Sequence, residues 1–136
     1  MAIISKNAEV QEELASVYEH LLTKRAGIKK ELKIIRNEFS SQCDIYILNG
    51  YNDNTSPIIT NKHYLEKFLE YDTHCHIIDI LNDFKDVYGY FPEYEEMYKT
   101  LYDTMIRFAD EENYECAAFV KYWVDQIQRI INEKMD

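Results

Sequence analysis

The sequence predicts a mainly α-helical protein. Only three Gly and two Pro interrupt 136 residues, and these two residue types are the strongest breakers of regular structure. Apolar residues recur every three or four positions through most of the chain, which is the spacing of one helix face. Hydrophobic residues make up 46% of the sequence, so the chain can bury a core of its own. We expect an N-terminal helical arm (1–40), a loop or short hairpin (41–60) and a helical domain (61–136).

Residues 1–40 carry the longest apolar stripe, and it stays in phase across Gly27. The stripe consists of Val10, Leu14, Val17, Leu21, Ile28, Leu32, Ile35 and Phe39. It predicts one long helix in which the stripe alone extends about 45 Å. The diameter of a domain of this size barely matches that length, so one end of the helix is expected to overhang the core. An overhanging stripe favours a homodimer through this helix, with Leu14, Val17 and Leu21 as self-association positions. The alternative is a helix bent at Gly27.

Residues 41–60 break the helical period. Ile45 to Leu48 form a short apolar run, and Asn49-Gly50 after it is a strong turn signal. Ile58 to Thr60 are then positioned to return as a partner strand. A short β-hairpin or an ordered loop is expected here, because isolated hairpins are only marginally stable.

Residues 61–91 predict two middle helices. Leu65, Phe68 and Leu69 mark the first, and Asp72 or Thr73 is placed to cap the second. The apolar residues of the second are Ile77, Ile78, Leu81, Phe84 and Val87. Gly89 and Pro92 then interrupt the chain.

Residues 92–134 predict an antiparallel helical hairpin closed by the turn "DEEN". The first helix has Tyr94, Met97, Leu101, Met105 and Phe108 on one face, and the second has Tyr114, Ala117, Val120, Val124, Ile127 and Ile131. So short a turn forces the helices to pack side by side. Ala109, Ala117 and Ala118 permit the close approach, and we expect Tyr114 to cover the open end.

This hairpin resembles the UVR motif, the C-terminal helical hairpin of the UvrB and UvrC excision-repair proteins, with related hairpins in McsA and ClpC. The resemblance covers residues 101–131. Its first-helix positions are Leu101, Met105 and Ala109, its central step is Tyr114, Glu115, Ala117 and Ala118, and its second-helix positions are Val120, Val124, Ile127 and Ile130. The chain departs from the family at Lys121-Tyr122, where Arg-Asp is usual.

The resemblance implies protein–protein contact through an apolar face. The last helix has a second such face, formed by Phe119, Trp123 and Ile130 beside Tyr122, and these four residues are the expected contacts with a partner protein. The leading hypothesis is therefore a small non-enzymatic adaptor or regulator. Burial of the same face within the domain is the competing interpretation.

An alternative function follows from charge. The net charge is −10, and residues 1–40 carry seven Lys or Arg against six Glu, so the negative charge lies in the later part of the chain. It is densest at Glu93, Glu95, Glu96, Asp103, Asp110, Glu111, Glu112 and Glu115. Such a surface is typical of an inhibitor, antitoxin or immunity-type protein that imitates nucleic acid in a basic groove.

Several other classes are disfavoured. Direct nucleic-acid binding and attachment to an anionic membrane both require excess Lys and Arg. Three Cys without CxxC spacing, and no signal-peptide pattern, indicate reduced thiols in the cytoplasm. His74, Cys75 and His76 point in different directions on a helix, so we predict no metal site, and His74 is interpreted as a partly buried structural residue. No cofactor motif or catalytic constellation is found.

Overall fold

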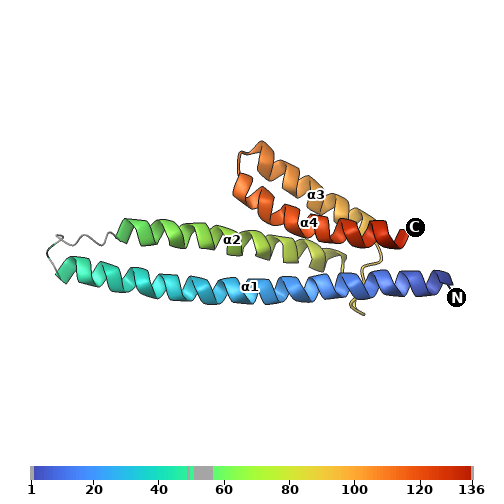
Figure 1. The fold of residues 1–136 in the computed structure, drawn as a ribbon, viewed down its shortest axis with the longest axis horizontal. Helices are drawn as coiled ribbons and strands as arrows, with labels where there is room; N and C mark the ends of the chain where they lie inside the picture. Colours follow the sequence, from blue (N-terminus) through green and yellow to red (C-terminus); the bar gives the residue numbers. More distant parts are fainter. Residues whose placement is uncertain (1, 49, 51–56, 136) are drawn as a thin grey trace.

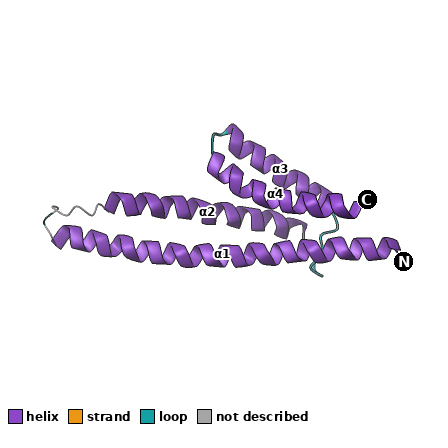
Figure 2. Ribbon diagram, in the orientation of Figure 1, coloured by secondary structure: helices purple, strands orange, loops and turns teal. Residues whose placement is uncertain are grey.

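The described residues form four helices and no strand (Figures 1 and 2). The computed structural model of the chain describes residues 2–48, 50 and 57–135. The helices are α1 (Ala2–Leu48), α2 (Pro57–Phe84), α3 (Tyr94–Asp110) and α4 (Tyr114–Met135). The mainly α fold predicted from the sequence is confirmed, together with the long first helix and the C-terminal hairpin.

Helix α1 is continuous and spans 47 residues, or about 70 Å at 1.5 Å per residue. Seven residues of the predicted stripe are buried along it: Val10, Leu14, Val17, Leu21, Ile28, Leu32 and Ile35. Gly27 lies inside the helix with no atom within 4 Å of the position a Cβ would take. Helix α1 runs through Gly27 without folding back. The alternative of a helix bent at Gly27 is therefore wrong.

The predicted hairpin at 41–60 is wrong where the structure describes it. Ile45 to Leu48 are the last turn of α1, and Ile58 to Thr60 belong to the first turn of α2. The helical stripe in fact continues, because Phe39, Gln42, Cys43 and Tyr46 are half-buried at helical spacing. Three residues of the apolar run that predicted a strand are exposed on this helix: Ile45, Ile47 and Leu48. The connection at 51–56 lies outside the described residues.

The two middle helices are one helix, α2. Thr73 does not cap a new helix, since its hydroxyl donates a hydrogen bond to the Leu69 carbonyl at 2.8 Å, four residues back in the same helix. Helix α2 also ends earlier than expected. Val87 is 92% exposed in the loop that follows Phe84.

Two antiparallel hairpins pack against each other (Figure 1). Helices α1 and α2 form the longer hairpin and α3 and α4 the shorter one; α4 packs on both α1 and α2, and α3 packs on α2. The main core lies where they meet and includes Leu14, Leu21, Ile77, Leu81, Phe91, Met97, Leu101, Val120, Val124 and Ile127. Beyond this core the α1–α2 pair continues alone as an arm, here defined as residues 28–48 and 57–71 (Figure 1).

The loop between α2 and α3 is fixed to α1 by a buried pair of hydrogen bonds. The Gln11 side-chain amide donates to the Phe91 carbonyl at 3.0 Å and accepts from the Phe91 backbone N–H at 2.6 Å. Phe91 itself is fully buried. The loop's outer part folds around Asp86, whose carboxylate accepts from the backbone N–H groups of Tyr88 and Tyr90.

The α3–α4 turn is closed by backbone hydrogen bonds. Glu112 donates to the Ala109 carbonyl and Asn113 to the Phe108 carbonyl, the pattern of a Schellman helix end. This pattern places Glu112 in the left-handed region, with φ of 63°. Tyr114 does not cover the end of the hairpin as expected, since it is 66% exposed.

Candidate functional site

An open groove of about 620 Å³ lies where α4 begins, between α1, α2 and α4. We call it the core groove. Its lining residues are His20, Thr23 and Lys24 from α1, Glu70 and His74 from α2, and Ala118, Phe119, Tyr122 and Trp123 from α4. The α4 residues recur at helical spacing, so one face of α4 forms a wall while its opposite face packs against α3.

His74 forms the floor of the core groove and has a defined proton arrangement. Its Nδ1 lies 2.8 Å from the Glu70 carbonyl oxygen, and its Nε2 lies 3.1 Å from Nε1 of Trp123. A carbonyl only accepts and an indole N–H only donates. The proton is therefore on Nδ1, and His74 is neutral. Burial lowers the pKa of His74, which agrees with the neutral form.

Aromatic rings surround this histidine. The His74 ring lies 6.1 Å from the Trp123 ring in an edge-on arrangement and 5.8 Å from the Phe119 ring. Tyr122 packs edge-on against Trp123 at 4.9 Å. The groove wall is thus a fixed aromatic cluster whose polar nitrogens are already paired.

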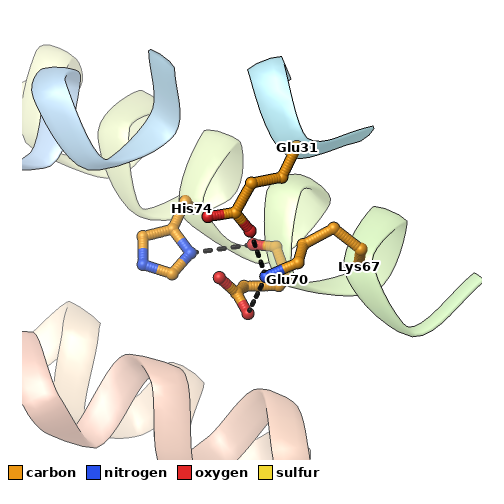
Figure 3. A network of polar contacts seen from close by, with 4 residues as sticks. All are labelled: Glu31, Lys67, Glu70 and His74. Carbon is orange, nitrogen blue, oxygen red and sulfur yellow. Dashed lines mark hydrogen bonds and ion pairs between the residues drawn. The ribbon is translucent and has the colours of Figure 1, made fainter. Parts of the chain in front are cut away.

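A charged network lies at the edge of the core groove (Figure 3). Lys67 contacts Glu31 across the two helices at 2.5 Å and Glu70 along α2 at 3.6 Å. The hydrogen bond to Lys67 lowers the pKa of Glu31, and the same bond raises the pKa of Lys67. The network is partly exposed, so its main effect is to position Glu70 rather than to add stability.

The four predicted partner contacts lie in different environments. Tyr122 is 58% exposed, Phe119 is half-buried, and Trp123 is 5% exposed. These three residues meet in the core groove. Ile130 is buried in the main core and does not line the groove. Most of the second apolar face of α4 is therefore buried within the same chain, and only its N-terminal end remains open.

The α1 and α2 walls of the core groove were not predicted from the sequence. The lining residues of these walls lie on two different helices, and no local sequence pattern shows that the helices pair there: His20, Thr23 and Lys24 on α1, and Glu70 on α2. His74 was correctly interpreted as a structural histidine, but its Trp123 partner is 49 residues away. In the sequence, His74 shares a helix face with Ile78 and Leu81, and this spacing is the signal that points to its burial.

The self-association positions Leu14, Val17 and Leu21 are buried within the chain. The expectation of an overhanging, uncovered stripe is wrong in its premise, because α2 runs beside α1 along most of its length (Figure 1). These three residues offer no surface to a second copy in this fold.

The eight acidic residues singled out from the sequence are all exposed: Glu93, Glu95, Glu96, Asp103, Asp110, Glu111, Glu112 and Glu115. They lie along α3 and around its turn to α4. Their arrangement is therefore an outer surface of the shorter hairpin and not part of the core groove.

The His74-Cys75-His76 stretch is divided among three surroundings. His74 faces the core groove, His76 packs edge-on against Phe108, and Cys75 lies beside Tyr71, whose pKa is raised by the hydrogen bond between them. Among the described residues, no group of three or more His, Cys, Asp or Glu is arranged to hold a metal ion.

No family model, curated protein or solved structure matches this chain. Within the described ranges, no helix combines the length and apolar character needed to cross a membrane.

Proposed function

We propose that this chain is a small non-enzymatic interaction protein, an adaptor or regulator that uses its UVR-like hairpin to bind another protein. The core groove receives an apolar side chain of that partner. The observation that carries the proposal is Tyr122, which is 58% exposed above half-buried Phe119 and buried Trp123. Exposed aromatic residues beside a preformed apolar hollow are the usual anchors of protein interfaces.

The rigidity of the groove floor supports this proposal. Trp123 is held by its bond to His74, and His74 is held by the Glu70 carbonyl. A partner that enters therefore does not have to order these side chains or find them new hydrogen-bond partners. Preorganisation of this kind lowers the entropic cost of binding.

The chemistry of the groove also restricts its occupant. Phe119, Tyr122 and Trp123 form an apolar wall, while Lys24 and Glu70 lie on the opposite side with one charge of each sign. A branched aliphatic or aromatic side chain of the partner fits against the apolar wall. A neighbouring polar group or charged residue of the partner then pairs with Lys24 or Glu70. A strongly charged nucleic-acid backbone does not.

The proposal is tested by capturing the partner protein with tagged wild-type chain and with two matched variants. Tyr122→Ala removes the exposed anchor and is expected to weaken binding by about 1–3 kcal/mol, roughly 5- to 150-fold. Tyr102→Ala, which is 43% exposed on α3, is the control because it lies outside the groove. Tagged wild-type protein and the control should retain the same partner, and Tyr122→Ala should lose it. If all three proteins retain the same set equally, the groove is not the binding site.

The second candidate is an acidic inhibitor whose surface imitates nucleic acid. The observation that favours it is the exposure of all eight carboxylates on the shorter hairpin. A partner bound through this surface should be lost steeply as salt rises from about 50 to 200 mM and should be lost from a Glu95→Lys, Asp103→Lys variant. A partner bound through the core groove should tolerate both changes and remain sensitive to Tyr122→Ala.

A further inference from the structure

A second groove lies on the arm, between α1 and α2. Lys29, Lys33 and Arg36 of α1 line one side, Tyr64, Phe68 and Tyr71 of α2 line the other, and the volume is about 360 Å³. We call it the arm groove. Its floor is buried Leu32. The basic residues recur at steps of four and three, which places them on one side of α1.

The arm groove combines positive charge with accessible rings. No carboxylate is among its lining residues, and no ion pair joins Lys29, Lys33 or Arg36 within the described part of the chain. Phe68 is 46% exposed, and the Tyr64 and Phe68 rings stack at 6.3 Å. The ligand that fits is an anion that also carries an aromatic or apolar group.

The α3–α4 turn of the same protein has this chemistry. Tyr114 is 66% exposed at the turn, and Asp110, Glu111, Glu112 and Glu115 beside it are exposed as well. The turn thus presents one exposed aromatic ring together with four exposed carboxylates, and we call it the acidic tip. Its charge is opposite to that of the arm groove, and both surfaces are open.

The two surfaces do not meet within one chain. Helix α3 packs on α2 and α4, and it makes no contact with α1 among the described residues. The acidic tip lies on the side of α2 away from α1 (Figure 1), whereas the arm groove opens between α1 and α2. Two complementary surfaces that cannot meet within one chain can still meet between two copies of it.

We infer that this protein forms a two-fold dimer in which the acidic tip of each copy enters the arm groove of the other. Tyr114 packs against the Phe68 and Tyr64 rings, and the tip carboxylates pair with Lys29, Lys33 and Arg36. A two-fold pair uses both surfaces of each copy and leaves neither unpaired. This association uses different surfaces from Leu14, Val17 and Leu21, and it is independent of the core groove.

The first measurement is mass by light scattering at tens of micromolar and low salt. The expected mass is twice the 16.3 kDa of one chain, and it should fall toward one chain as salt is raised, because exposed ion pairs are screened. A single-chain mass at low salt overturns the proposal. A mass that rises above that of two chains as the protein concentration increases would contradict a closed two-fold dimer.

Charge reversal provides the decisive experiment. Lys33→Glu in the arm groove and Glu111→Lys in the acidic tip should each weaken the dimer at least about tenfold, since each places like charges together. The controls are Lys30→Glu, on the same helix but outside the groove lining, and Asp103→Lys, on α3 away from the turn. Both should leave the dimer unchanged.

Mixing the two reversed variants should restore a dimer. In the mixed pair, one contact is wild type on both sides and the other has its charges exchanged, so both contacts are again complementary. The chain that carries both substitutions should also dimerise. If mixing restores nothing although each variant keeps its helical circular dichroism, the tip does not bind the groove.

Discussion

His74 connects packing to pH at the scale of one residue. Its Nε2 accepts from the Trp123 indole only while the ring is neutral. A proton on Nε2 would remove that hydrogen bond and place a charge among the Phe119 and Trp123 rings. The residue therefore stabilises the fold in one protonation state and opposes it in the other.

We expect the free energy of unfolding to fall as the pH is lowered below the unfolded-state value of 6.5. Burial holds the pKa of His74 below 6.5 in the folded protein, so between the two values the unfolded chain binds more protons than the folded one. Stability is then complete above pH 6.5 and is lost as the pH falls through the folded pKa. Urea unfolding at several pH values measures this slope.

The comparison for this prediction is His74→Gln, which cannot titrate in this range. It should be less stable at neutral pH but show a shallower loss toward acid. His63→Gln, at an exposed position on the same helix, should keep the wild-type slope. If His74→Gln loses as much free energy of unfolding toward acid pH as the wild type, other groups cause the acid sensitivity.

At the scale of the elements, the α3–α4 turn contains a correctable strain. Glu112 adopts φ of 63°, a conformation that costs a residue with a Cβ about 1 kcal/mol and costs glycine almost nothing. Glu112→Gly should therefore raise the free energy of unfolding by about 0.5–1 kcal/mol in chemical denaturation. Glu111 has φ of −83°, so Glu111→Gly removes the same charge without relieving strain and should be destabilising.

The elements that the sequence predicted are those whose signal is local. The stripe from Val10 to Ile35 defines α1, and the short turn with Ala109 and Ala117 defines the α3–α4 hairpin. The prediction failed at Ile45 to Leu48, where a run of β-forming residues hid a helical pattern carried by half-buried Gln42, Cys43 and Tyr46. The helix continues through this run to Leu48, because strand preference depends on context and does not by itself end a helix.

The candidate site was predictable only on the α4 side. Phe119, Tyr122 and Trp123 are adjacent at helical spacing and could be grouped from the sequence. Lys24 and Glu70 are brought to them by the packing of three helices, and that packing depends on which apolar faces meet. The same is true of Phe91, which no pattern marked and which Gln11 fixes from 80 residues away.

At the scale of the whole molecule, stability is expected to differ between the core and the arm. Ile127 is fully buried among three other helices, whereas Ile35 is buried in the arm, where α1 contacts only α2. A two-helix segment has fewer contacts to hold it than a four-helix core, so it opens locally at lower free energy. Backbone amides of residues 33–48 should exchange hydrogen faster than those of residues 120–127.

Matched substitutions test this gradient. Ile35→Ala and Ile127→Ala each remove the same atoms and should cost about 2–4 kcal/mol. Ile35→Ala should accelerate exchange in the arm and leave the core amides unchanged, and Ile127→Ala should accelerate exchange in both. Equal acceleration of the core by Ile35→Ala would show that arm and core unfold as one unit. The measurement is made at high salt, where the proposed dimer is expected to dissociate.

The hydrogen bonds between Gln11 and Phe91 join two segments that are synthesised 80 residues apart. The part of α1 from Val10 to Leu21 is synthesised before the residues that cover it, which lie between Ile77 and Ile130. Along α1 and α2, the two sides of the arm are closer in sequence than the parts that meet in the core, so pairing them closes a smaller loop. We therefore expect α1 and α2 to pair first in the arm and then toward the core. The segment from Val10 to Leu21 is then the last part of α1 to be buried, and until that point its apolar side is open to chaperones.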